Sequence, residues 1–169
     1  MKKLTADEIR ASFVNCSKGV AQRLSLPDLD AQPWDDLDLL GWVDPSGSGT
    51  SYLVTERPVH GSEDDSEPIG FVLRASKGSG VKRQSMCSLC LTVHSSSDVA
   101  LMTAARPGAA GRAGNSRGNY LCADLGCSLY VRGLRQPARV QPHETITREV
   151  KVMRLRSNLT EFVERLAQE

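Results

Sequence analysis

Four of the five cysteines fall into two close pairs, and this pattern constrains the fold more than any other feature. The first pair is Cys87-Ser-Leu-Cys90 and the second is Cys122-Ala-Asp-Leu-Gly-Cys127. A Cys-x-x-Cys turn can aim two thiolates at one point, and a second pair completes the tetrahedron that structural Zn²⁺ requires. The sequence therefore predicts a metal site with Zn²⁺ as cofactor and no open position for a catalytic water.

The cysteine pairs have alternative interpretations. A redox Cys-x-x-Cys stands at the start of a helix, whereas residues 82–86 and 91–93 around the first pair are typical of two strands joined by a turn. A disulfide remains the other alternative, although paired cysteines in a reduced compartment are more often metal ligands. His94 could compete as a ligand, but a solvated position or one beside the ligands is favoured. Cys16 has no close partner in the sequence and is expected to be a small buried residue.

The second pair is followed by the start of a short helix. Residues 128–132 have a helical pattern, and Gly133 ends it. A knuckle, a hairpin and a second pair that enters a helix are the layout of a treble-clef finger. Strands are expected over 52–56, 69–75 and 97–105, with the first two antiparallel. The Gly-, Ala- and Arg-rich stretch 107–118 is expected to be a loop.

Helices are predicted at both ends of the chain. Thr5 and Glu8 form a capping box for a first helix, and a second short helix is expected over 17–24. Residues 144–167 predict a long helix, and its apolar stripe is expected to pack on the core, with an interface as the alternative. The members of that stripe are Ile146, Val150, Met153, Leu159, Phe162, Val163 and Leu166.

Together these elements predict an α+β fold: short N-terminal helices, a small antiparallel sheet, a four-cysteine treble-clef zinc finger and a long C-terminal helix. We divide the chain into an N-terminal helical segment (1–45), a sheet with the zinc finger (46–143) and a C-terminal helix (144–169), and we expect one compact unit.

Acidic residues are concentrated near the N-terminus. Residues 25–55 contain no Lys or Arg but hold Asp28, Asp30, Asp35, Asp36, Asp38 and Asp44. These carboxylates could bind a metal or act in catalysis. We favour a structural turn in which Trp34, Leu37, Leu40 and Trp42 are anchored in the core, because no His or nucleophile is near in sequence.

Basic residues are concentrated around the second cysteine pair, although the net charge is only +1. Between Thr103 and Val140 one acid, Asp124, opposes Arg106, Arg112, Arg117, Arg132, Arg135 and Arg139. A basic lobe predicts an RNA partner or an acidic protein surface. The arginines could instead balance a doubly negative zinc tetrathiolate.

Other features limit the function class. The three histidines, His60, His94 and His143, are far apart in sequence and form no recognisable triad, so an enzyme is not expected. No apolar run is long enough to cross a membrane, and the N-terminus lacks the apolar core of a signal peptide. We expect a cytoplasmic monomer.

Several segments resemble a known family. They are ASFVNCSKG at 11–19, PWDDLD at 33–38, SMCSLC at 85–90 and GNYLCAD at 118–124. They resemble the FBP-domain proteins of actinobacteria, which are similar to the FusB-type proteins that bind elongation factor G and protect the ribosome from fusidic acid. The resemblance covers nearly the whole chain for the first group and mainly the zinc-finger half for the second.

The resemblance implies a partner and a set of site residues. It implies a zinc finger that binds elongation factor G and helps it leave a stalled ribosome. The ligands would be Cys87, Cys90, Cys122 and Cys127. Arg117 and Tyr120, a basic-x-x-Tyr motif before the third cysteine, would contact the factor, and the basic lobe around Arg112, Arg117 and Arg132 would meet an acidic patch. The alternative is direct binding of RNA, such as ribosomal RNA, without elongation factor activity.

Overall fold

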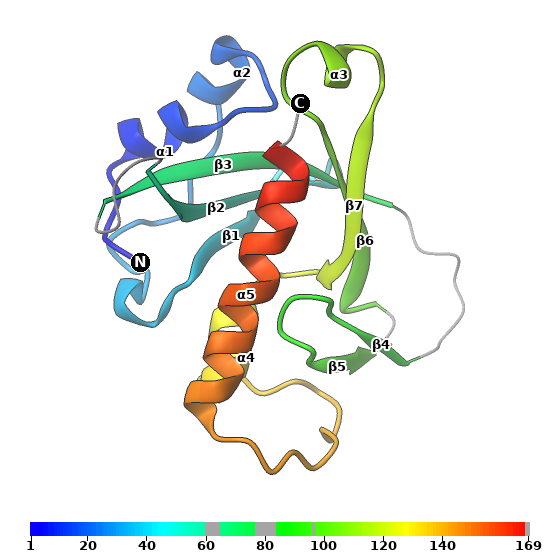
Figure 1. Ribbon diagram of the computed structural model, residues 1–169. Helices are drawn as coiled ribbons and strands as arrows, with labels where there is room; N and C mark the ends of the chain where they lie inside the picture. Colours follow the sequence, from blue (N-terminus) through cyan, green and yellow to red (C-terminus); the bar gives the residue numbers. More distant parts are fainter. Residues whose placement is uncertain (60–64, 77–83, 96, 168–169) are drawn as a thin grey trace.

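A five-stranded antiparallel sheet runs through the middle of the computed structural model, which describes residues 1–59, 65–76, 84–95 and 97–167 (Figure 1). In spatial order its strands are β1 (Leu39–Val43), β2 (Thr50–Pro58), β3 (Ser66–Ala75), β6 (Val99–Ala105) and β7 (Ser116–Cys122). A separate two-stranded sheet consists of β4 (Gln84–Met86) and β5 (Val93–Ser95). The predicted strands at 52–56, 69–75 and 97–105 are thus present, and the first two pair in antiparallel register.

The large sheet consists of two parts, the strands β1–β3 and the β6–β7 hairpin, which few residue pairs join. β2 and β3 pair from Thr50↔Arg74 to Pro58↔Ser66, whereas β3 and β6 share only Arg74↔Thr103 and Ala75↔Met102. Because so few pairs join β3 to β6, the β6–β7 hairpin extends away from the other three strands (Figure 1). The hairpin carries Cys122 at the end of β7 and thereby connects the sheet to the predicted metal site.

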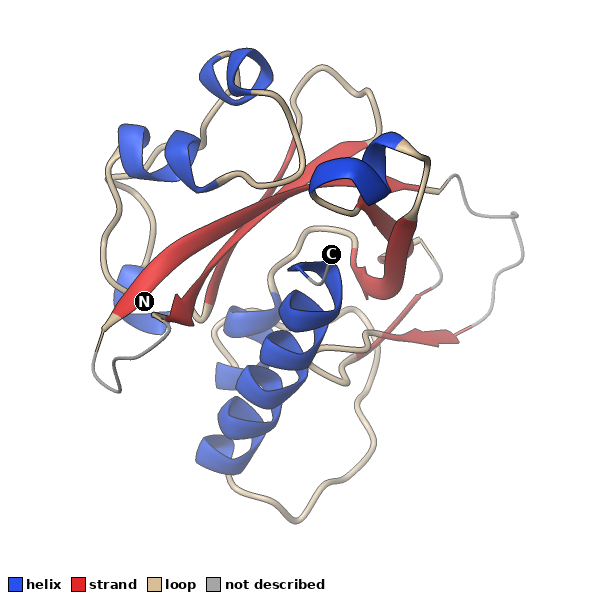
Figure 2. Cartoon of the chain, turned by 45° about the horizontal axis from the view of Figure 1, so that its top comes forward, coloured by secondary structure: helices blue, strands red, loops and turns tan. Residues whose placement is uncertain are grey.

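The N-terminal helices cover one face of the sheet (Figure 2). α1 (Ala6–Ser12) begins with the predicted capping box: the Glu8 backbone N–H donates to Thr5 Oγ1, and the Thr5 N–H donates to the Glu8 carboxylate. α2 (Lys18–Gln22) follows. The core under them consists of Leu4, Ile9, Phe13, Ala21, Leu24, Trp34, Leu37, Leu40, Trp42, Tyr52 and Val54.

The C-terminal helices cover the opposite face (Figures 1 and 2). α4 (Cys127–Arg132) has the predicted end at Gly133, which adopts a left-handed conformation with φ of 71°. α5 (Arg148–Ala167) packs across the sheet through Leu155, Leu159, Phe162, Val163 and Leu166. All four paired cysteines belong to the same core as these side chains, so the metal site lies in the interior of the protein.

Two parts of the predicted C-terminal helix differ from the structure. The helix begins at Arg148 and not at Glu144, and Thr147 precedes it, accepting the backbone N–H of Val150. Val150 and Met153 were expected in the buried stripe, but both are exposed. The stripe starts at Leu155, because the first turns of α5 lie beside α4 and the loop that follows it, beyond the edge of the large sheet (Figure 1).

The acidic segment is anchored as expected, but it is not only a turn. Trp34, Leu37, Leu40 and Trp42 are all buried. A short 3₁₀-helix (Trp34–Asp36) leads into β1, which forms an edge of the large sheet. β1 was not foreseen because both of its faces are covered, so it lacks the alternation that identifies a half-exposed strand.

The stretch 107–118 is more ordered than predicted. It contains a short helix, α3 (Gly108–Arg112), and the beginning of β7 at Ser116. Pro107 supplies a suitable start for the helix, and pairing with β6 extends β7 backward. Cys16 is half-buried. Among the described residues, no helix combines the length and apolar character needed to cross a membrane.

Candidate metal centre

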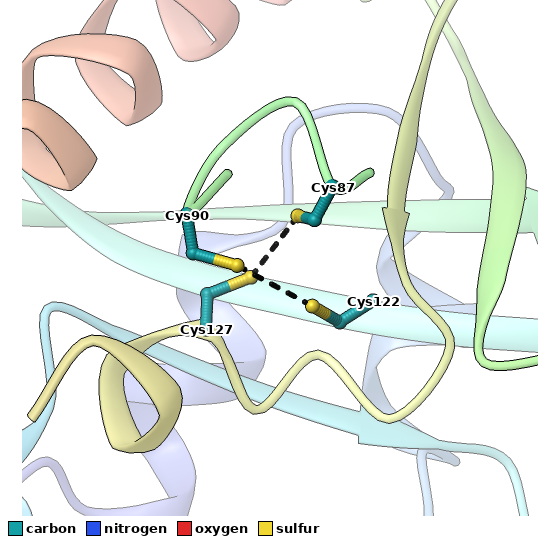
Figure 3. A group of neighbouring side chains, drawn as sticks. All are labelled: Cys87, Cys90, Cys122 and Cys127. Carbon is teal, nitrogen blue, oxygen red and sulfur yellow. Dashed lines mark hydrogen bonds between the residues drawn. The ribbon is translucent and has the colours of Figure 1, made fainter. Parts of the chain in front are cut away.

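Three separate parts of the chain bring the four cysteines to one point (Figure 3). Cys87 and Cys90 lie on the turn between β4 and β5, Cys122 ends β7, and Cys127 starts α4. The four sulfur atoms lie within 4.8 Å of one another. The Cys87–Cys127 and Cys90–Cys122 sulfurs are 3.6 Å and 3.5 Å apart. All are free thiols and no disulfide joins them.

The spacing of the sulfur atoms fits a tetrahedral metal. With metal–sulfur bonds of about 2.3 Å, the corners of a Zn²⁺ tetrathiolate are about 3.8 Å apart. The observed separations need only small adjustments to reach that value. All four cysteines are buried, so a tetrathiolate here has no solvent-facing coordination position. Such closed sites stabilise a fold, whereas catalytic zinc sites keep a position open.

Each of the two cysteine turns contains a leucine in a strained backbone conformation. Leu91 and Leu125 have φ of 58° and 53°, in the left-handed region that non-glycine residues rarely adopt. The Leu91 N–H donates to the Cys87 carbonyl at 2.9 Å, and the Leu125 N–H donates to the Cys122 carbonyl at 2.9 Å. Each such residue costs about 1–3 kcal/mol, and metal coordination is the interaction available to offset that cost.

The electrostatics of the thiols also favour a bound cation. Hydrogen bonds from Cys122, Cys127 and Cys90 hold the pKa of Cys87 well below its ordinary value. The pKa of Cys127 is raised, first by its interaction with Cys122 and then by those with Cys87 and Cys90 and by burial. The cluster therefore resists a second negative charge. A divalent, thiophilic ion held by the four sulfurs would remove this conflict, because its charge would favour release of the thiol protons to solvent.

His94 lies beside the cluster and is not one of its four corners. Its Nε2 is 3.4 Å from Cys122 Sγ, and the side chain is buried. The imidazole packs edge-on against Tyr130, with ring centroids 4.7 Å apart. The Tyr130 hydroxyl donates to Asp124, which also accepts from Arg135. Burial, and then Asp124, raise the pKa of Tyr130. His94 therefore occupies the expected position next to the ligands, where its ring can donate to a thiolate.

A buried ion cluster connects the acidic segment to α4 and α5. Asp38, with 3% of its side chain exposed, accepts from Arg132 Nη1 at 2.5 Å and Nη2 at 3.2 Å and from Arg156 Nε at 2.8 Å. Ser128 Oγ on α4 accepts the Asp38 and Leu39 backbone N–H groups. Burial raises the pKa of Asp38, but the two arginines outweigh burial and hold it below its ordinary value.

The structure separates the four predicted partner-binding residues into two groups. Arg112 ends α3, and Arg117 and Tyr120 lie on β7, so these three exposed residues share the β6–β7 hairpin. Arg132 lies on α4, at the other end of the molecule in Figure 1. Its side chain is only 11% exposed because Asp38 holds it, so it offers a partner little surface. Asp38 and Arg156 were not recognised as a pair from the sequence.

Neither of the remaining histidines is placed in the four-cysteine cluster of the described residues. His143 is exposed in the connection between α4 and α5. His60 lies outside the part of the chain that the structure describes.

Comparison with known families is consistent with this geometry. Residues 8–166 match the family model described as FBP C-terminal treble-clef zinc-finger. No curated protein and no solved structure matches the chain. The match covers the N-terminal helices as well as both cysteine pairs and α5, so the family describes the whole fold and not only the finger. The chain belongs to the FBP C-terminal treble-clef zinc-finger family.

Proposed function

We propose that this protein is a non-enzymatic, zinc-stabilised binding protein that engages translation elongation factor G and promotes its release from the ribosome. The observation that carries the proposal is membership of the FBP family over residues 8–166, joined to a closed four-cysteine site inside the core. The FusB-type proteins that the sequence resembles bind this factor. A buried tetrathiolate suits a scaffold that presents a binding surface.

Zinc is the ion that the site favours. Four thiolates in a tetrahedral arrangement suit Zn²⁺ or an iron–sulfur cluster, and hard cations such as Mg²⁺ and Ca²⁺ prefer oxygen ligands. A mononuclear ion fits sulfur atoms that lie within 4.8 Å of one another. A bound ion would cross-link β7, α4 and the β4–β5 turn.

The proposed mechanism needs no catalytic group in this chain. The elongation factor supplies its own GTPase chemistry. A protein that binds one conformation of the factor more tightly than another shifts the factor toward that conformation. If the favoured conformation has low affinity for the ribosome, binding speeds release.

The β6–β7 hairpin is the proposed contact surface. Arg112 and Arg117 form no ion pair with the described residues, and Tyr120 is a large exposed apolar side chain on the outermost strand. Arginine and tyrosine are enriched at the centres of protein interfaces. Arg117 and Tyr120 are three residues apart on β7 and so project from opposite faces of the strand, which means that a partner would have to grip the edge of the hairpin to contact both. The arginines would meet an acidic patch on the factor, with fast and salt-sensitive association.

The test is titration calorimetry of the protein against purified elongation factor G, with zinc content measured on the same sample. Stoichiometric zinc and micromolar or tighter binding support the proposal, and release is then followed with ribosomes stalled by fusidic acid. Tyr120→Ala should keep the zinc and the melting temperature but weaken binding about tenfold or more. Unchanged affinity would remove Tyr120 from the interface, and zinc without any binding would refute the function.

Direct binding of RNA is the second candidate. The same unpaired arginines could meet phosphates, and Tyr120 could stack on a base. Both functions are salt-sensitive, so salt dependence does not separate them. Parallel titrations with purified ribosomal RNA and with the purified factor do.

A further inference from the structure

The first turns of α5 expose a mixed basic and apolar stripe. Arg148, Val152 and Arg156 recur every four residues and therefore lie along one side of the helix. Met153 lies beside Val152 and is 58% exposed. Leu134, just after α4, is 59% exposed. Exposed apolar side chains grouped in this way and bordered by charges are typical of interaction sites.

These side chains line one concave surface, which we name the α4–α5 notch. It has a volume of about 350 Å³ and is lined by Leu134, Val152 and Met153, with the charged residues Asp36, Arg132, Arg148, Glu149 and Arg156 around them. The notch lies where α4 and the start of α5 run beside each other, at the end of the molecule away from α3 (Figure 1). It is thus distinct from the surface of the β6–β7 hairpin.

Asp38 holds Arg156, one of the two exposed arginines of the notch, in place before any partner binds. The Asp38 carboxylate accepts from Arg156 Nε, and the Arg156 side chain is nevertheless 62% exposed. A guanidinium held by one edge loses less rotamer entropy when a second carboxylate binds its other edge. The buried ion cluster therefore orients Arg156 outward as well as stabilising the fold.

Arg148 stands in an unfavourable local position. It is in the first turn of α5, where a cation opposes the helix dipole at a cost of about 0.3–1 kcal/mol. Glu144 pairs with Lys151 at 3.0 Å and with Arg154 at 2.8 Å. Among the described residues, Arg148 has no ion pair of this kind. The charge of the neighbouring Glu149 offsets part of this cost, and an incompletely compensated cation of this kind is expected at functional positions.

We propose that the α4–α5 notch binds an acidic amphipathic segment of the partner protein. The segment places one apolar side chain between Leu134 and Met153, and its carboxylates reach Arg148 and Arg156. These two arginines are eight residues apart on the helix, or about 12 Å, so the carboxylates lie about two helical turns apart. The proposal rests on the proposed function, because the partner is taken to be elongation factor G.

Protein suits this surface better than RNA. Phosphates could meet the two arginines, but they would leave Leu134 and Met153 without an apolar partner. Asp36 and Glu149, which also line the notch, would repel a continuous phosphate backbone more than they would repel two separate carboxylates.

The test compares three variants with the wild type in calorimetric titrations against purified elongation factor G. Met153→Glu places a charge in the notch, and Arg148→Glu reverses one of its cations. Val20→Glu on α2 is the matched control, since Val20 is also exposed but lies on the opposite face of the sheet. All four proteins are checked for zinc content and melting temperature. We expect Met153→Glu and Arg148→Glu to weaken binding about tenfold or more, and Val20→Glu to change it less than about twofold.

The other outcomes separate the two proposals. If the wild type binds and neither notch variant weakens binding, the notch proposal is wrong and the proposed function stands. If the folded, zinc-loaded wild type does not bind, the proposed function fails and the notch proposal fails with it. If Arg148→Glu weakens binding but Met153→Glu does not, the apolar anchor is refuted, and a titration with purified ribosomal RNA then shows whether the arginines serve a nucleic acid.

Discussion

Substituting Asp38 by Asn tests whether the buried ion cluster holds the acidic segment to α4 and α5. Asn keeps the size of the side chain and one acceptor oxygen but removes the negative charge. Arg132, only 11% exposed, then loses the charge of the carboxylate closest to it, and Arg156 loses the charge of its inner contact. Breaking a buried pair costs about 3–5 kcal/mol. The contact to Arg156, which is 62% exposed, adds at most about 0.5 kcal/mol.

Two features reduce the expected cost. The amide oxygen of the substituted side chain can still accept one hydrogen bond, worth about 1 kcal/mol, and Arg132 keeps its bond to the Ser128 carbonyl at 3.1 Å. We therefore expect Asp38→Asn to lower the free energy of unfolding by about 2–4 kcal/mol. Urea denaturation with excess zinc at about pH 7 measures it. Asp36→Asn is the matched control: its contact to Arg132 is 3.8 Å long and its side chain is 47% exposed, so it should cost less than about 0.5 kcal/mol.

The pH dependence provides a second check. The folded pKa of Asp38 lies below its unfolded value, so the carboxylate stabilises the fold above the unfolded pKa and loses that effect as the pH falls through the folded pKa. The difference between wild type and Asp38→Asn should thus be the same at about pH 7 and about pH 5.5. Equal costs for Asp38→Asn and Asp36→Asn, or a difference that shrinks in this window, would refute the reasoning.

Three further predictions concern the metal centre. Cys122→Ser should abolish stoichiometric zinc binding and unfold the C-terminal half, and native melting in the metal-free variant would contradict a structural metal. His94→Phe should speed zinc transfer to a chromogenic chelator about tenfold, and His94→Gln, which keeps a donor, should speed it less; equal rates for all three proteins would exclude a hydrogen bond to Cys122. Gly41→Ala should cost about 1–3 kcal/mol in thermal unfolding, because the new Cβ would overlap the Leu125 side chain and press on the second turn of the site; an unchanged melting temperature would show that Leu125 can move away.

The elements that sequence analysis predicted correctly are those whose determinants are local. The capping box at Thr5 involves residues three apart, and Gly133 ends α4 by its own left-handed conformation. The cysteine pairs are likewise short motifs, so their chemistry could be inferred before their geometry was known. The treble-clef arrangement followed from the order of these local pieces.

The features that sequence analysis missed depend on contacts between distant residues. Asp38 lies 94 positions from Arg132 and 118 from Arg156, and nothing near it in sequence distinguishes it from the other aspartates of its segment. Val150 and Met153 fit the helical period of α5, but the period does not say how far a helix extends past the surface it covers. That surface is set by the sheet, and so the exposed notch could only be seen in the structure.

The position of the metal site in the core determines which experiments can locate the binding surface. The four cysteines share one apolar cluster with Leu89, Leu121 and the buried side of α5. Removing the metal therefore loosens the same core that positions β7 and the first turns of α5. Chelation of the metal would then be expected to abolish partner binding whether the partner contacts the hairpin, the notch or another surface. Only substitutions of exposed side chains that leave zinc and stability unchanged, such as those at Tyr120 and Met153, can distinguish these surfaces.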